Sequence, residues 1–291
     1  MIKRYIHSVL LVTLFWSVPA LAQHHDHAFP AIEQAYGKGE ISFEEQLLFK
    51  FRAVFNPQLL DEQFETLNRR LKCLTPTVVE FENNRSRISQ PVVSEIESYL
   101  QPSVAGMAEY ISPSGLFTIS YETSGSNAVP LEDANSNGIP DYVEEAGIAA
   151  DSSYRHEVMN LGNTDPIPVG ERYPILLADI GPYGFTQREF GGNIQTSIVV
   201  ENDFVGFPEN DDPDGDQLGA LRVTIAHEFK HAIQYADNEW SGESDRWLEM
   251  DATLMEEVVY DEVNDYYNYI FNGSFGDPIF LRPNRSVIPG S

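Results

Sequence analysis

The stretch "VTIAHEFKHAIQY", residues 223–235, carries two histidines and a glutamate in one apolar segment. The segments around its two histidines are apolar and compatible with a helix, so we expect a buried helix here. His227 and His231 are four positions apart, which on a helix places both imidazoles on one face and about one turn apart. Two imidazoles in that arrangement can share one metal ion. Glu228 would project beside the ion, where its carboxylate can accept a proton from a metal-bound water.

A third ligand must be found before this motif can be distinguished from two histidines that are merely packed in a core helix. Zinc in hydrolases takes three protein ligands and keeps a fourth position for water. His156 is the only other histidine in the part of the chain that is expected to fold, but it lies far upstream. Asp237 follows His231 by six residues. Enzymes that use this position have a helix-breaking glycine where this chain has Gln234, so we expect Asp237 to point away.

Glu249 is the better candidate for the third ligand. It lies in "RWLEMDATLMEE", residues 246–257, which begins a second helix after the polar loop "DNEWSGESD". The loop lets the two helices fold back against each other with Glu249 facing the histidines, and Ala252 is small where the helices would approach closely. Glu256, two turns beyond Glu249, is the next candidate, either as a ligand or as an acceptor for a histidine N–H.

These motifs resemble those of known zinc peptidases. "HEFKH" followed later by "EMDA" resembles the HExxH and ExxA or ExxS motifs of the gluzincins, which include thermolysin and the gluzincin aminopeptidases. The chain also resembles a family of secreted bacterial proteins grouped as metallopeptidases. Those proteins combine a helical N-terminal region, a strand near "SPSGLF", a loop like "NGIPDYVE" and then HExxH. The resemblance covers most of residues 32–270.

The resemblance implies a zinc peptidase in which His227, His231 and Glu249 bind zinc and Glu228 is the general base. It also implies a zincin-like catalytic domain, with a twisted sheet, the HExxH helix and a following glutamate helix. One departure is Thr253, which stands where thermolysin-like sequences carry an acid that orients a histidine. We expect an endopeptidase rather than an aminopeptidase, because we find no glutamate motif for a free amine.

The pattern of predicted elements favours an α+β fold. Residues 114–125, 172–180 and 196–204 are predicted strands, and helices are predicted at 217–237 and 246–262. Strands that precede helices are typical of an α+β domain. We expect "TSIVVENDF", residues 196–204, to be an edge strand that pairs with an extended peptide, since main-chain pairing accepts any sequence.

Residues 1–22 predict a secretory signal peptide. "MIKR" is a short positive head, an apolar run follows it, and "ALA" before Gln23 is a small-x-small cleavage pattern. We therefore expect a secreted or periplasmic protein, and no later segment is apolar enough to span a bilayer. The "HHDH" segment, residues 24–27, is either a polar tail or a site that scavenges zinc.

The expected mature chain divides into two regions. Residues 23–110 predict a helical N-terminal region that is either a propeptide or a helical prodomain, with Ser42 and Glu45 as a capping box. Residues 111–291 are the expected zincin-like domain. Its last segment, residues 281–291, has no clear stop structure, so the domain could be incomplete at this end.

The charge of the chain limits its partners. Asp and Glu outnumber Lys and Arg by 45 to 18, for a formal net charge of −27. A field of that sign repels nucleic acid and anionic membrane surfaces. We expect a protein or peptide substrate, no nucleic-acid partner, no membrane attachment after signal cleavage, and a monomer.

The loop "DANSNGIPDYVE", residues 133–144, predicts a calcium site. Its oxygen ligands have the spacing of an EF-hand-type loop, with Gly138 at the sharp turn. The expected ligands are the side chains of Asp133, Asn135, Asn137, Asp141 and Glu144 and the carbonyl of Ile139. Only three of the side-chain ligands are acidic, which predicts weak binding suited to extracellular calcium. The alternative is a turn that binds no ion.

Two further alternatives remain open in the sequence. Cys73 is the only cysteine and cannot form an internal disulfide. It is either a buried apolar residue, or a thiolate that occupies the open zinc position and keeps the enzyme silent. The whole protein could also be a catalytically idle, metal-stabilised binding or adhesion module, although an idle site would have no need of a base at Glu228.

Overall fold

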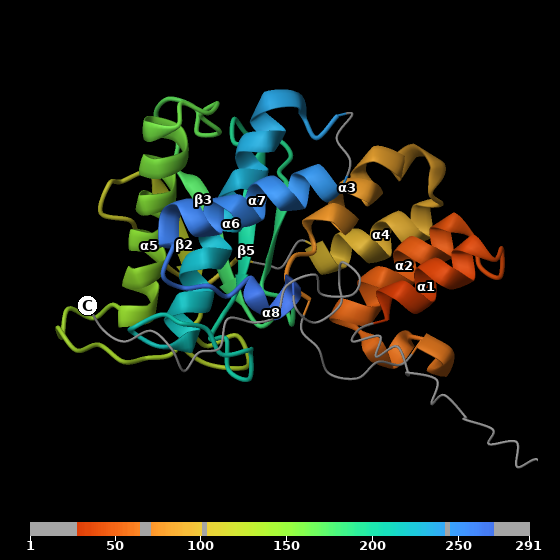
Figure 1. The fold of residues 1–291 in the computed structure, drawn as a ribbon, viewed down its shortest axis with the longest axis horizontal. Coiled ribbons are helices and arrows are strands. Elements are labelled where there is room, and N and C mark those ends of the chain that lie inside the picture. Colours follow the sequence, from red (N-terminus) through yellow and green to blue (C-terminus); the bar gives the residue numbers. More distant parts are fainter. Residues whose placement is uncertain (1–27, 65–70, 101–103, 242–244, 271–291) are drawn as a thin grey trace, which may run out of the picture.

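A mixed five-stranded sheet forms the centre of the fold (Figure 1). Its order is β1-β2-β3-β5-β4; the three inner strands are parallel, and the edge strands β1 and β4 are antiparallel to their neighbours. The strands are β1 Ala108–Ile111, β2 Phe117–Tyr121, β3 Tyr173–Ala178, β4 Gly184–Arg188 and β5 Thr196–Glu201. The three predicted strands are present as β2, β3 and β5. Strands β1 and β4 were not predicted from the sequence pattern.

The computed structural model describes residues 28–64, 71–100, 104–241 and 245–270. The expected signal peptide, the "HHDH" segment and residues 281–291 lie outside these ranges. The α-helices are α1 Phe29–Gly37, α2 Phe43–Phe55, α3 Thr75–Asn84, α4 Gln90–Leu100, α5 Asp141–Ser153, α6 Asp216–Asn238, α7 Asp245–Tyr260 and α8 Tyr267–Ile270. Three short 3₁₀ turns span Pro57–Leu59, Glu62–Phe64 and Arg85–Arg87, and a π-helical segment spans Tyr154–Asn160.

Helices and strands thus make up a mixed α+β fold, as the sequence predicts. The helical content of the N-terminal region agrees with its pattern, and the capping box forms. The amide of Glu45 donates to Ser42 Oγ, and the amide of Ser42 donates to Glu45 Oε2. The helices expected at 217–237 and 246–262 are α6 and α7, with ends that differ from the prediction by at most two residues.

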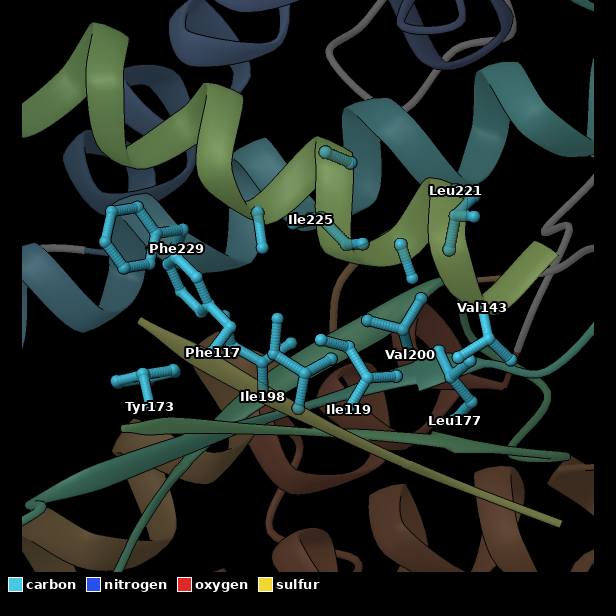
Figure 2. Packing of buried hydrophobic residues seen from close by; sticks show 14 of the residues in the cluster. Phe117, Ile119, Val143, Tyr173, Leu177, Ile198, Val200, Leu221, Ile225 and Phe229 are labelled. Carbon is cyan, nitrogen blue, oxygen red and sulfur yellow. The ribbon is translucent and has the colours of Figure 1, made fainter. Parts of the chain in front are cut away.

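One face of the sheet packs against α5 and α6. Alternate residues of β2, Phe117 and Ile119, point toward these helices together with residues of β3 and β5 (Figure 2). Phe229 of α6 meets Phe117 edge-on, with ring centroids 5.5 Å apart. Helix α6 is therefore held on the sheet by its apolar side.

The opposite face of the sheet is covered by the N-terminal helices. Apolar residues of α2, α3 and α4 share one buried cluster with Leu176, Phe185 and Val199 of the sheet. In Figure 1 these helices lie at the opposite end of the molecule from α5, with strands between them. The N-terminal region therefore packs on the sheet as a layer of the same fold, and its removal would expose an apolar face.

The strand β5 is not an edge strand, so the expectation for "TSIVVENDF" is wrong. It lies between β3 and β4, and every one of its residues from Thr196 to Glu201 is buried. A run of buried apolar residues is the pattern of an inner parallel strand, and the sequence alone did not identify the strand that flanks it. The edge beside it is β4. Among the described helices, none combines the length and the apolar character needed to cross a membrane.

Candidate metal centre

Helix α6 carries the two histidines in a fully buried position. His227 is 1% exposed, and Glu228 and His231 are 0% exposed. The edge strand β4 approaches the helix closely at Gly184, where an added Cβ would lie 2.8 Å from Thr224 Cγ2 and 3.1 Å from Glu228 Cγ. Only a glycine fits there, and its small size places the start of β4 directly against the motif.

Helix α7 folds back onto α6 and brings Glu249 to the histidines. Glu239 and Trp240 adopt left-handed backbone conformations that end α6, and the Trp240 indole N–H donates to the carbonyl of His231 at 2.9 Å. Glu249 Oε1 then lies 3.1 Å from His231 Nε2, and Glu249 Oε2 lies 3.6 Å from His227 Nε2. Ala252 is completely buried, as a close approach of the two helices requires.

A fourth donor comes from the N-terminal region. Sγ of Cys73 lies 3.5 Å from His231 Nε2. One donor atom each of Cys73, His227, Glu228 and His231 lies within 4.8 Å of the others. This buried group could hold a metal ion. The Glu249 carboxylate approaches the same two imidazoles, so two acids compete for the role of ligand.

Two of the donor separations can be compared with those around a tetrahedral ion. Bonds of about 2.0–2.1 Å to nitrogen and oxygen place such donors roughly 3.4 Å apart, and a bond of about 2.3 Å to sulfur widens a nitrogen–sulfur pair to roughly 3.6 Å. The Glu249 and Cys73 distances to His231 agree with these values. His227 Nε2 is buried and has no hydrogen-bond partner among the described residues, so this nitrogen could bind a cation once it has lost its proton.

Both imidazoles are held by acceptors on their other nitrogen. Nδ1 of His227 lies 2.7 Å from Glu256 Oε1, and Nδ1 of His231 lies 2.7 Å from Gln234 Oε1. An acceptor on Nδ1 favours the tautomer that carries its proton there and leaves Nε2 as the metal donor. Glu256 thus has the acceptor geometry that was one of its two expected roles. No motif in the sequence signals the contact between Gln234 and His231.

Glu228 is held on one side and unpartnered on the other. Its Oε2 accepts hydrogen bonds from Thr75 Oγ1 at 2.8 Å and from Thr186 Oγ1 at 3.0 Å. Its Oε1 is buried and has no hydrogen-bond partner among the described residues. With Oε2 engaged by two hydroxyls, Oε1 is the oxygen of Glu228 that remains for an ion or a water, so Glu228 and Glu249 are both candidate ligands. Both threonines come from segments distant in sequence, and no motif signals them.

Burial and the neighbouring carboxylates set the protonation of the site. Burial lowers the pKa of His227, but the carboxylates of Glu249 and Glu256 outweigh it and raise the pKa to about 10. Burial opposes the charge of Glu249, yet the two imidazoles hold its pKa well below the usual range. Burial, Glu228 and Glu249 together raise the pKa of the Cys73 thiol well above its usual value. Without a metal the site therefore retains protons that a divalent cation would displace.

The other candidate ligands lie elsewhere. Asp237 accepts a hydrogen bond from Thr164 Oγ1, at the surface beyond the histidines. His156 lies in the π-helical segment and does not belong to the donor group found among the described residues.

The loop 133–144 folds into a tight turn before α5. Asp133 accepts hydrogen bonds from the amides of Asn137 and Gly138, and Gly138 has a φ of +88°. The Glu144 carboxylate accepts from the side-chain amides of Asn135 and Asn137. The amide of Ala134 donates to Asp141 Oδ2 at 3.0 Å. These contacts gather the expected ligands, but Glu144 is engaged by amide hydrogens, and this geometry does not indicate a calcium site.

Comparisons with known proteins do not identify the chain. No protein-family model matches it, and neither the curated proteins nor the solved structures give a significant match.

Proposed function

We propose that the chain is a zinc-dependent peptidase. His227, His231 and Glu249 would hold the ion, and Glu228 would act as the general base. The observation that carries this proposal is the Glu228 carboxylate, which is 0% exposed, fixed at Oε2 by two hydroxyls and unpartnered at Oε1. A buried, unpaired carboxylate oxygen is costly in a site that is merely structural, so its retention beside two imidazoles supports a chemical role.

The chemistry follows from the roles of these side chains. A zinc ion in the site would supply Lewis acidity toward a carbonyl oxygen and lower the pKa of a bound water. Glu228 Oε1 would accept the proton of the attacking water while the oxygen bonds to the peptide carbonyl carbon. Glu228 would then return the proton to the amide nitrogen as the carbon–nitrogen bond breaks. The products are a carboxylate and an amine. Thr186 would keep Oε2 engaged, so that Oε1 faces the water.

The edge strand β4 is the best place for an extended peptide substrate. It begins at Gly184, directly against Glu228 Cγ, and it is the strand at that edge of the sheet. Main-chain pairing with an edge strand would let the enzyme accept many sequences, which suits an endopeptidase. The strong negative charge of the chain disfavours nucleic acid as a partner, and a secreted or periplasmic location fits a peptidase that acts on protein outside the cytoplasm.

Calcium is proposed as a stabilising ion in the loop 133–144. Asp133, Asn135, Asn137, Asp141 and Glu144 are brought together by the turn, and the Ile139 carbonyl follows the sharp bend at Gly138. Calcium would have to displace the hydrogen bonds that the side-chain amides of Asn135 and Asn137 donate to the Glu144 carboxylate. This cost agrees with weak binding.

A second function is favoured by one specific contact. Cys73 next to His231 makes a set of four protein donors, and a closed set of four is typical of structural zinc rather than catalytic zinc. On that basis the chain would be a metal-stabilised binding or adhesion module without activity. The two functions differ in whether the site can be opened to a substrate.

Hydrolysis of casein, an unstructured protein, tests the proposal. Cys73→Ser and Cys73→Ser/Glu228→Gln would be compared at equal zinc content, so that the thiol is absent from both. Loss of the base should leave about one zinc per chain and slow hydrolysis at least about a hundredfold. Equal hydrolysis by the two variants would exclude Glu228 as the base, and no hydrolysis by zinc-loaded Cys73→Ser would favour the binding module.

A further inference from the structure

We propose that Cys73 is a fourth metal ligand, delivered by a strap of residues 71–75 that closes the site to substrate in the intact chain. This inference concerns regulation. It rests on the proposed function only for the identity of the substrate that the strap would exclude. The ligand and its strap can be tested without any hydrolysis.

The position of the thiol carries the first step. Cys73 Sγ is buried, lies 3.5 Å from His231 Nε2 and shares one donor group with His227 and Glu228. A buried cysteine alone is usually a packing residue. Here a second observation points to an ion, because the buried Nε2 of His227 faces the same group without a hydrogen-bond partner. A thiolate at this place would fill the position that a catalytic zinc site keeps for water.

The strap also occupies the edge of β4. The amide of Tyr183 donates to the carbonyl of Leu71 at 3.0 Å, and the amide of Leu74 donates to the carbonyl of Gly184 at 3.1 Å. Cys73 runs parallel to Gly184 in an isolated bridge, and the amide of Thr186 donates to Thr75 Oγ1 at 2.8 Å. These are the main-chain groups that an extended peptide at this edge would need. The strap and a substrate therefore exclude each other.

Two side chains anchor the strap beside the thiol. Lys72 Nζ lies 2.5 Å from Asp265 Oδ2 and 3.1 Å from Glu256 Oε2, the same carboxylate that contacts His227. Leu74 is completely buried in the cluster between the N-terminal helices and the sheet. Cys73 thus lies between two fixed neighbours, and its place at the metal is set by folding.

The strap reaches the general base as well. Thr75 Oγ1 donates to Glu228 Oε2 at 2.8 Å, so one segment of five residues touches a metal-binding histidine, the base and the substrate edge. Because the helices after the strap share a core with the sheet, opening the site requires the strap to leave locally while that layer stays packed. The intact chain is therefore latent.

Cobalt spectroscopy of the full exported chain tests the ligand directly. Cobalt(II) would replace zinc in wild type, Cys73→Ser, Cys73→Ala and Val78→Thr. Val78 faces the apolar cluster from α3, so Val78→Thr controls for loosened packing near the strap. Wild type and Val78→Thr should show a near-ultraviolet thiolate-to-cobalt charge-transfer absorption, which both Cys73 variants should lack. Cobalt-loaded wild type without that absorption would overturn the proposal.

Acetohydroxamate, a small oxygen ligand for open metal sites, then tests the closure. Binding is followed by the change in the visible cobalt spectrum. Half-saturation should need about tenfold less acetohydroxamate, or less still, in both Cys73 variants than in wild type. The reason is that the ligand can bind only to the fraction of chains in which the site is open. Equal half-saturation would overturn the latch. If the Cys73 variants admit acetohydroxamate but do not cleave casein, the latch stands and the peptidase function fails.

Discussion

Sγ of Cys73 lies 3.5 Å from Nε2 of His231, which is 158 residues later in the chain. This contact joins the N-terminal helical region to the helix with the HExxH motif. It follows that the N-terminal region contributes a side chain to the group that could hold a metal ion, in addition to covering one face of the sheet. The regulation and the chemistry of the proposed enzyme therefore depend on the same few side chains.

Replacement of Glu249 should remove the metal. Glu249→Ala is expected to lower zinc occupancy far more than Asp237→Ala, because Glu249 lies within 3.6 Å of both Nε2 atoms and Asp237 is bound to Thr164. Zinc content after dialysis against a weak chelator measures this difference. If Asp237→Ala loses as much zinc as Glu249→Ala, Asp237 would have to be assigned as a zinc ligand.

Replacement of Gln234 should weaken zinc binding without removing a ligand. Gln234→Leu deletes the acceptor on Nδ1 of His231, and losing such a contact typically lowers metal affinity about 10- to 100-fold. Thr253→Ala is the matched control, since the resemblance to thermolysin-like sequences would place the orienting group at Thr253. A competition titration with a chromophoric chelator gives both affinities. If Thr253→Ala weakens binding as much as Gln234→Leu, the structural assignment is wrong.

Lys72 should contribute strongly to the stability of the metal-free chain. Its ammonium is 13% exposed and pairs with Glu256 and Asp265, which are 1% and 0% exposed. Burial lowers the pKa of Lys72, but the two carboxylates outweigh it and keep the group charged. Lys72→Met leaves two buried acids without their cation and should lower the free energy of unfolding by about 3 kcal/mol.

Urea unfolding with chelator present measures this change, and Lys50→Met provides the comparison. Lys50 is as buried as Lys72, but one of its partners, Glu33, is 55% exposed and can be solvated after the change. The Lys50 variant should therefore lose about 1 kcal/mol or less. Equal losses of unfolding free energy in the two variants would argue against a special contribution of the buried ion pairs of Lys72.

Calcium should raise the melting temperature through the loop 133–144. At a concentration ten times the dissociation constant it would stabilise the folded chain by about 1.4 kcal/mol, or a few degrees. Asp133→Ala and Glu144→Ala should abolish this response without loss of zinc. Glu132→Ala, which removes an adjacent exposed acid, should retain it. If millimolar calcium leaves the melting temperature of the wild-type chain unchanged, the calcium proposal is refuted.

The sequence predicted the parts of the site that local periodicity determines. The spacing of His227 and His231 needs only one helix, and the placement of Glu249 needs only that α7 fold back on α6. The helical N-terminal region followed from apolar spacing and its capping box. These features depend on neighbours in sequence, so they can be derived without a structure.

The remaining features depend on contacts between distant segments. The strand β5 was expected at an edge because the pairing order of strands is not encoded in the pattern of any one strand. The hydroxyls of Thr75 and Thr186 meet Glu228 only because the strap, β4 and α6 converge at Gly184. For Cys73 the sequence favoured simple packing over a metal contact, and only the tertiary fold brings the thiol to His231.

Anomalous X-ray scattering from crystals of the zinc-loaded chain, measured above and below the zinc absorption edge, can show whether a single zinc ion lies between α6, α7 and the strap. We expect one zinc peak, surrounded by His227, His231, Glu249 and Cys73. A zinc peak bounded by Asp237 or His156 in place of Glu249, or no peak between the two histidines in chains that contain zinc, would contradict it.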